Sequence, residues 1–171
     1  MNELKKKYSE EIRHILAKYP PEYKRSAVIP LLYLAQRETG RISQEVMSEI
    51  AGILDMSTTD IASIVGFYTL FHEEPGGRYR IQVCTDLPCA LRGAESFFQA
   101  LCAFLGIGPG ETTADGLFTV EEVKCLAACH RGPMFQIQGD GHIDYHENQT
   151  LETAKIVIEG LRHASQKEGG G

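Results

Sequence analysis

The sequence lacks any run of about eighteen consecutive apolar residues, so no segment is long enough to cross a bilayer. It also lacks a basic surplus, because 17 Lys and Arg stand against 23 Asp and Glu. A general nucleic-acid binder needs the opposite balance to neutralise phosphates and is therefore excluded. The first residues mix both charge signs around no apolar segment, so no secretory signal is expected. We predict a cytoplasmic protein without direct membrane insertion.

The remaining composition is that of an ordinary globular protein, with 171 residues of which 43% are hydrophobic and 23% charged. This length suits one domain of full size, or one domain with a helical extension. Five cysteines without an export signal indicate thiols that are kept reduced or bound to metal, instead of a disulfide framework.

Four amphipathic helices are predicted in the first part of the chain, where apolar residues recur at helical spacing. The first helix covers residues 4–19. The second is expected to begin with Ser26 as its N-cap and the third with Ser43. Ser57 and Asp60 have the spacing of a capping box for the fourth helix, which should turn Tyr68 and Phe71 inward.

The apolar period changes to two after Pro75-Gly76-Gly77, the clearest break in the chain. The predicted elements are a strand over 79–84, a helix over about 92–105, strands over 118–123, 134–138 and 142–145, and a helix after Thr150. This order is a thioredoxin-like arrangement. The predicted fold class is α+β: an N-terminal helical bundle in residues 1–75, then a thioredoxin-like α/β domain with a four-stranded mixed sheet in residues 78–165.

Two cysteine pairs each follow a predicted strand, Cys84 with Cys89 and Cys125 with Cys129. If these strands are parallel neighbours joined by a right-handed crossover helix, their carboxyl ends lie side by side. Open α/β sheets bind ligands at that edge. We therefore predict that these four thiolates meet and hold a metal cofactor.

Three occupants fit four cysteines: a pair of disulfides, a zinc ion or a two-iron, two-sulfur cluster. The reducing compartment disfavours disulfides. Structural zinc sites mostly use a short C-x2-C spacing, which neither pair has, although four thiolates suit zinc well. A 2Fe–2S cluster is wider than one ion and each of its irons takes one pair, so looser loops are acceptable. We favour the cluster and retain zinc as the alternative.

The residues around the cysteines suit an anionic cofactor. Cys89 is expected at the entry of a helix, whose free N–H groups favour negative charge. Arg92, His130 and Arg131 flank the ligands and would raise a reduction potential by their charge, although surface roles fit them equally well.

Pro133 stands where thioredoxin-like folds often place a cis-proline, so we predict a cis Gly132–Pro133 bond.

Other cysteine chemistry is less well supported by the sequence. Cys102 lies on the apolar stripe of a predicted helix and is expected in the core. Cys125, Cys129 and His130 form a stretched version of the haem-attachment motif, which normally requires C-x-x-C-H. The pairs also lack the C-x-x-C spacing of thiol–disulfide catalysts, and no catalytic residue is assigned.

Two stretches, VCTDLPCALRGAESFFQAL and GETTADGLFTVEEVKCLAACHRGPM, resemble the small thioredoxin-like subunit of NADH–quinone oxidoreductase, respiratory complex I. The helical stretches RSAVIPLLYLAQRETG and IVGFYTLF are similar to the N-terminal region of the same family. The resemblance extends from about Tyr19 to Arg162, nearly the whole chain.

This resemblance implies one 2Fe–2S cluster on Cys84, Cys89, Cys125 and Cys129. It implies that FMN and NADH bind a larger flavoprotein partner within a multisubunit complex, peripheral to the inner membrane, and that the N-terminal helices dock there. The same module serves NAD-linked formate dehydrogenases and hydrogenases, while a zinc-stabilised interaction domain is the alternative of a different class.

The sequence departs from the family at three positions near the proposed ligands. Family members commonly carry glycine where Ala127 stands, and small or uncharged residues where His130 and Arg131 stand. None of these changes removes a cysteine, but they bring a family-typical reduction potential into question.

Overall fold

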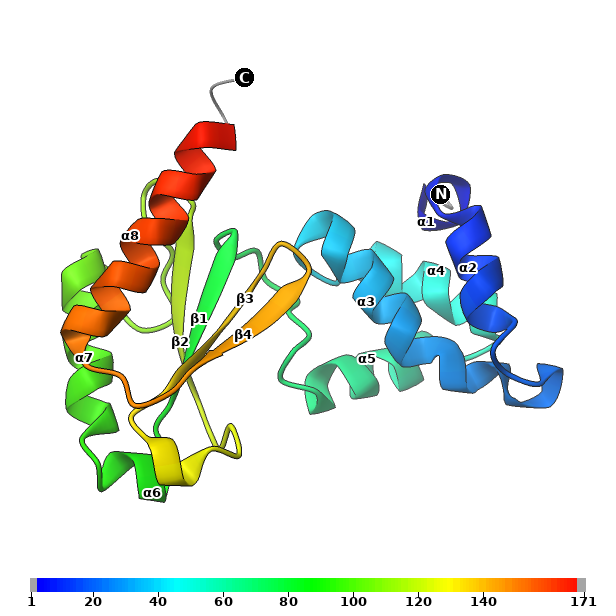
Figure 1. The fold of residues 1–171 in the computed structure, drawn as a ribbon. Coiled ribbons are helices and arrows are strands. Elements are labelled where there is room, and N and C mark those ends of the chain that lie inside the picture. The colour runs from blue at the N-terminus through cyan, green and yellow to red at the C-terminus, as the bar shows by residue number, and fades with distance from the viewer. Residues whose placement is uncertain (1–2, 169–171) are drawn as a thin grey trace. The chain divides into compact units, whose positions relative to one another are not determined.

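The computed structural model describes residues 3–168, and the chain divides between Pro75 and Gly76 into two compact units (Figure 1). Each unit has a hydrophobic core built from its own residues. The first unit contains only helices and the second contains the sheet.

The helical unit has more breaks than the sequence pattern predicts. Its elements are α1 (Glu3–Lys7), α2 (Ser9–Leu16), a 3-10 helix (Pro21–Ala27), α3 (Val28–Thr39), α4 (Gln44–Leu54) and α5 (Thr58–Phe67). The single helix predicted over 4–19 is wrong, because Tyr8 leaves the helical region with φ −120° and ψ 32°. Ser26 is not an N-cap either. Pro21 opens the 3-10 helix, and α3 follows directly without a side-chain cap.

The two later helix starts agree with the prediction. Ser43 accepts a hydrogen bond from the Val46 backbone N–H at 3.4 Å. The Ser57 hydroxyl accepts one from the Asp60 backbone N–H at 3.0 Å, and the Asp60 carboxylate accepts one from the Ser57 N–H at 3.4 Å. This reciprocal pair is the predicted capping box, which satisfies two N–H groups that the helix itself leaves unpaired.

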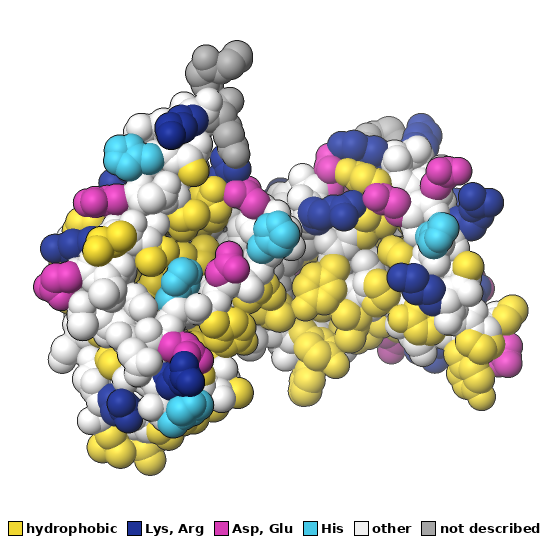
Figure 2. Space-filling view, in the orientation of Figure 1, with side chains coloured by type: hydrophobic (Ala, Val, Ile, Leu, Met, Phe, Trp, Pro, Cys, Tyr) yellow, Lys and Arg dark blue, Asp and Glu magenta, His cyan; other side chains and the backbone are white. Residues whose placement is uncertain are grey.

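The end of α5 places aromatic side chains on the surface. Because the helix stops at Phe67, Tyr68 is 44% exposed, contrary to the prediction that it turns inward. Phe71 is buried, as predicted. Phe67 itself is 78% exposed and packs edge-on against Tyr68. Hydrophobic side chains gather on this part of the helical unit (Figure 2).

No single helix within residues 3–168 has the length and apolar composition to cross a membrane. Helices α4 and α5 reach that length and apolar composition only together, and the pair is bent by 117°.

The sheet of the second unit has the order β2-β1-β3-β4. The strands are β1 (Tyr79–Cys84), β2 (Phe118–Val123), β3 (Phe135–Gly139) and β4 (His142–His146), and the helices are α6 (Leu87–Ala90), α7 (Ala94–Leu105) and α8 (Leu151–Glu168). β1 is parallel to β2 and antiparallel to β3, and β4 is antiparallel to β3. The predicted four-stranded mixed sheet is confirmed.

The two faces of the sheet differ in polarity, as the period of two requires. Helices α7 and α8 cover one face (Figure 1), where Ile81 and Val83 are buried with Phe98 and Ile158. On alternate positions, the buried Gln136 donates a hydrogen bond from Nε2 to Oε1 of the buried Gln82 at 2.6 Å. This bond offsets the cost of burying the two amides.

The glycines at the unit boundary allow the chain to lie directly against the sheet. The Gly77 N–H donates to the Thr119 hydroxyl at 2.6 Å. A Cβ on Gly77 would lie 2.8 Å from the backbone carbonyl carbon and oxygen of Leu117, closer than real Cβ atoms come. Only glycine fits this contact without a shift of the backbone.

Candidate metal centre

The four predicted ligands lie on two loops at one edge of the sheet. Cys84 is the last residue of β1 and pairs in parallel register with Val123, the last residue of β2. Cys125 follows β2 by two residues. The Thr85 N–H donates to the Val123 carbonyl at 3.1 Å, so the loops begin side by side as predicted.

Both cysteines of the first loop are buried in a small apolar cluster. Cys84 and Cys89 are each 1% exposed, and they pack with Ala94, Ala128 and Met134. In contrast, Cys125 is exposed and Cys129 is half-buried. The site is therefore dry on one side and open to solvent on the other.

The four cysteine side chains lie close enough together to influence one another electrostatically. The Cys89 thiol hydrogen-bonds with Cys84 and also senses charge on Cys129 and Cys125. The pKa of Cys129 is raised by its hydrogen bond with Cys125, then by burial and by charge on Cys125 and Cys84. Cys84 and Cys129 therefore lie near each other, and their role as ligands of one cofactor stays a prediction.

The outer pair has the spacing of two ligands on one tetrahedral metal. The Sγ atoms of Cys125 and Cys129 are 3.6 Å apart, and all five cysteines of the chain are free thiols. Two thiolates bound at about 2.3 Å to a tetrahedral ion lie about 3.8 Å from each other. The donor set therefore fits a metal without rearrangement of this pair.

Thiols packed together in this way need a cation to lose their protons. Burial is the main cause that raises the pKa of the Cys89 thiol to about 12, and the hydrogen bond with Cys84 adds to it. A coordinated metal deprotonates a thiol outright, because its charge replaces the lost solvation. Four neighbouring thiols, of which Cys84 and Cys89 are buried, thus favour a bound metal cofactor.

The arrangement of the pairs suits a core of two metals. Within residues 3–168, the structure shows no group of three or more His, Cys, Asp or Glu side chains placed to hold a metal ion. A 2Fe–2S cluster makes a different demand, because each iron binds one pair of cysteines and sulfide bridges the irons. The buried pair and the outer pair match that division.

The backbone of the second loop completes the surroundings of the sulfurs. Ala127 has a positive φ of 61°, and its N–H donates to the Cys125 sulfur at 3.3 Å. Gly132 lies against Cys89, since a Cβ there would be 3.0 Å from the Cys89 sulfur. The Gly132–Pro133 bond is cis, which confirms that prediction.

The helix predicted from about Arg92 to Leu105 is present as α7, but Cys89 does not lie at its entry. Cys89 lies inside the short helix α6, and α7 begins only at Ala94. The Cys89 N–H already donates to the Asp86 carbonyl at 2.8 Å. The predicted helix-dipole contribution of a long helix at Cys89 is therefore absent.

The three flanking basic residues have different partners. Arg92 donates from Nε to the Gly132 carbonyl at 2.8 Å. Arg131 donates to the Glu147 carboxylate at 2.7 Å and to His130 Nε2 at 3.1 Å. The charge of Arg131 is thus compensated by a carboxylate, whereas the Arg92 guanidinium bonds to a neutral carbonyl.

Cys102 lies in the core, as predicted. It is 3% exposed and packs within the sheet core on α7. Burial raises the pKa of its thiol, so it remains protonated. Its place apart from the other four cysteines makes it a natural control.

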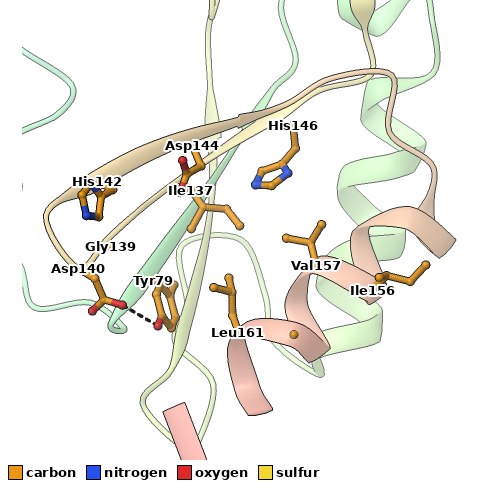
Figure 3. A pocket seen from close by; sticks show the side chains of 11 residues that line it. Tyr79, Ile137, Gly139, Asp140, His142, Asp144, His146, Ile156, Val157 and Leu161 are labelled. Atoms are coloured by element: carbon orange, nitrogen blue, oxygen red, sulfur yellow. Dashed lines mark hydrogen bonds between the residues drawn. The ribbon is translucent and has the colours of Figure 1, made fainter. Parts of the chain in front are cut away.

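A separate cavity of about 320 Å³ opens between β4 and α8 (Figure 3). His142, Asp144 and His146 point into it from alternate positions of β4, opposite Val157 and Leu161 of α8. The two histidines therefore share a face, but they are four strand positions apart, about 13 Å, which is too far for one metal ion. None of the four cysteines lines this cavity.

The GETTADG stretch forms a turn that leads into β2. The Thr113 N–H donates to the Phe118 carbonyl and the Gly116 N–H to the Thr113 carbonyl, both at 2.8 Å. The Asp115 carboxylate accepts from the Leu117 N–H at 3.1 Å. The stretch therefore has a structural role within the sheet unit.

The sequence did not reveal the contacts made by Gly132 and Ala127. The dipeptide Gly132-Pro133 indicates a turn, but the packing of Gly132 on the Cys89 sulfur depends on residues 43 positions apart in the chain. For Ala127, the available signal was the glycine that family members commonly carry at this position, because glycine is the residue that most easily adopts a positive φ.

Four cysteines on adjacent strand ends of a thioredoxin-like sheet define a small metallo-protein of the iron–sulfur class. Comparison with known proteins identifies one family for most of the chain. The family model of the thioredoxin-like [2Fe-2S] ferredoxin matches residues 12–162. The chain belongs to this family, and the family and fold class predicted from the sequence are confirmed.

Named relatives cover nearly the whole chain. NADH-quinone oxidoreductase subunit 2 of Thermus thermophilus is 39% identical over 157 residues, which are 92% of this chain and 85% of the relative. A second relative, an NADH-quinone oxidoreductase subunit of Rhizobium meliloti, is 41% identical over 157 residues, 92% of this chain and 90% of the relative.

The fold also occurs in a solved NAD+-reducing [NiFe]-hydrogenase in the air-oxidized state. The TM-score is 0.64 at 22% identity over 78% of this chain, which spans 23% of the hydrogenase chain. At this level of identity the likeness concerns the fold alone.

Proposed function

We propose that this chain is the electron-transfer subunit of NADH–quinone oxidoreductase and carries one 2Fe–2S cluster on Cys84, Cys89, Cys125 and Cys129. One observation carries this proposal: four free thiols lie near one another on the loops that follow two adjacent parallel strands. Family membership and two relatives named as subunits of that enzyme support it.

When bound, a 2Fe–2S cluster supplies a centre that takes up and releases single electrons. The residues of this chain hold and tune that centre. The buried Cys84 and Cys89 exclude water on the inner side, and the exposed Cys125 leaves the outer side accessible to a redox partner. The Ala127 N–H donates to the Cys125 sulfur and stabilises negative charge there.

The partner in this proposal is a larger flavoprotein that binds FMN and NADH. The helical unit exposes Tyr33 (40%), Phe67 (78%) and Tyr68 (44%), which supports the N-terminal helices as a docking surface. We place the chain in the cytoplasm, attached to the inner membrane only through the complex.

The equivalent subunit of a soluble NAD-linked hydrogenase is the second candidate. The fold shared with a chain of an NAD+-reducing hydrogenase favours it. Purification of the chain from its native source, with mass-spectrometric identification of the co-purifying subunits, separates the two candidates. Quinone-reductase subunits support the first proposal, and hydrogenase subunits support the second.

Anaerobic purification of the full chain tests the cofactor. We expect a red-brown protein that contains iron and inorganic sulfide in equal amounts and bleaches when dithionite reduces it. The isolated chain should not oxidise NADH. A colourless protein with bound zinc would instead identify a zinc-stabilised interaction domain and would overturn the redox proposal.

Single cysteine substitutions test the ligand set. Replacement of Cys84 or Cys129 by serine should abolish or alter the EPR signal of the reduced cluster, because serine replaces a thiolate ligand. Cys102→Ser is the matched control and should leave the signal intact. A loss of signal in Cys102→Ser would show that the proposed ligands are wrong.

A further inference from the structure

Arg92 forms hydrogen bonds to both cysteine loops. Its backbone N–H donates to the Cys89 carbonyl at 3.0 Å, as part of the first loop. Its side chain donates from Nε to the carbonyl of Gly132 at 2.8 Å, in the second loop. One residue therefore connects two segments that are 40 positions apart in the sequence.

The residue that Arg92 holds lies directly on a ligand sulfur. A Cβ on Gly132 would be 3.0 Å from the Cys89 sulfur and 3.4 Å from the Cys89 Cα. The backbone of Gly132 thus forms one wall of the place where this sulfur lies. Because Arg92 fixes the Gly132 carbonyl, it also fixes this wall relative to the first loop.

The charge of Arg92 adds a second effect. A guanidinium stays positive at every pH of interest. Four thiolates with a 2Fe–2S core are anionic and become more so with each added electron, so a nearby positive charge favours the reduced state. Arg131 has its charge offset by Glu147, whereas the Arg92 Nε bonds to a carbonyl.

We propose that Arg92 is a positioning residue of the cluster site: it holds Gly132 against the Cys89 sulfur and raises the reduction potential by its charge. This inference rests on the proposed 2Fe–2S function. It assigns a role to a residue that is not a ligand.

The test uses the full-length, cluster-containing chain and compares Arg92→Gln with Arg92→Lys. For Arg92→Gln, the reduced-to-oxidised ratio at a fixed potential should fall roughly three- to tenfold, equivalent to a midpoint lower by about 30 to 60 mV. The EPR line shape should also change, since the wall beside Cys89 is released. Arg92→Lys should recover most of the midpoint, because it keeps the charge, but not the line shape, because an ammonium does not reproduce the planar guanidinium contact.

Lys155→Gln is the matched control for charge. Lys155 lies over the ring of Phe104, near the carboxyl end of α7, whereas Arg92 precedes the start of that helix. The same loss of one positive charge there should leave both midpoint and line shape unchanged. An equal fall of the midpoint in Lys155→Gln would show that overall charge, and not Arg92, sets the potential.

Wild-type midpoint and line shape in both Arg92 variants would overturn the inference and leave the proposed function standing. A wild-type chain without a reducible cluster would overturn the proposed function itself. If Arg92→Gln fails to retain the cluster, Gly132→Ala tests the same contact from the other side while the arginine remains. It should alter the line shape by displacing the Cys89 sulfur, and an unaltered line shape would refute the positioning role.

Discussion

Ala127 carries backbone strain next to a proposed ligand. Its φ of 61° lies in the left-handed region, which costs a residue with a Cβ about 1–2 kcal/mol. Glycine relieves this strain but gives up about 0.5–1 kcal/mol of conformational entropy. We therefore predict that Ala127→Gly stabilises the protein by about 0.5–1 kcal/mol.

The measurement is thermal unfolding of the cluster-containing chain, with the midpoint potential as a second readout. The backbone N–H to Cys125 survives the change, so the potential should stay at the wild-type value. A destabilised Ala127→Gly protein would show that the left-handed backbone is not a cost at this position.

His146 gives the sheet unit a pH-dependent stability. Its ring stacks on Phe135 with centroids 4.9 Å apart, and burial lowers its pKa below the ordinary value, with Asp144 acting in the opposite direction. A histidine with a depressed pKa stabilises the folded state fully above the unfolded pKa of about 6.5 and loses that contribution as the pH falls further.

We predict that wild-type protein loses more unfolding free energy than His146→Gln between about pH 7 and pH 5.5. Chemical denaturation of both proteins at each pH measures the difference between their unfolding free energies. The contributions of the other titrating groups are the same in both proteins and cancel in this difference. His146→Phe keeps the ring contact and should behave like His146→Gln. Parallel pH profiles of all three proteins would exclude His146 as the cause.

Residue types and spacings predict candidate ligands but not the contacts that position them. The four cysteines could be chosen from the sequence because each pair follows a strand, and strand ends of a parallel pair meet. The bond from Arg92 to Gly132 could not, since it depends on how two loops turn after leaving the sheet. Local patterns contain no information on that approach.

At the scale of elements, α5 depends on its N-cap residue, Ser57. The Ser57 hydroxyl accepts the Asp60 N–H within the capping box. Loss of such a cap costs about 1 kcal/mol. Ser57→Ala should therefore destabilise the helical unit by about that amount.

Urea unfolding followed by helical circular dichroism measures this effect. Ser63→Ala is the matched control on the same helix, because the Ser63 hydroxyl only donates back to the Thr59 carbonyl. An exposed change of this kind should stay within about 0.5 kcal/mol. Equal losses in the two variants would contradict a specific role of the cap.

Helix and strand starts were predictable where a side chain or an alternation marks them. Ser43, Ser57 and the strand from Tyr79 to Cys84 agree with the sequence prediction. The wrong predictions concern helix boundaries that are set by backbone geometry alone. Tyr8 breaks a continuous apolar stripe, and Cys89 lies in a separate short helix, α6, instead of at the start of α7. Apolar spacing continues across such breaks, so it does not reveal them.

At the scale of the whole molecule, we propose that the two units are separate folding domains that meet at Pro75 and Gly76. Each has a core of fully buried side chains, with Leu31 and Ile50 in the helical unit and Ile81 and Phe118 in the sheet unit. All four proposed ligands belong to the second unit. The cluster site should therefore not need the helices.

We predict that a fragment of residues 76–168 takes up the cluster and gives the same EPR spectrum as the full chain. The helical fragment of residues 3–75 should fold only marginally, because a single core of about 70–80 residues rarely supplies more than about 3–5 kcal/mol. The sheet fragment should lose affinity for the flavoprotein partner if that partner docks on the exposed aromatic residues of the helical unit, because the fragment lacks them.

Reconstitution of the sheet fragment and of the full chain under identical anaerobic conditions tests this prediction, with bound iron and the EPR spectrum as readouts. A fragment that fails to retain iron, beside a full chain that retains it, would mean that the helices help to fold the cluster site and that the two units are one cooperative domain.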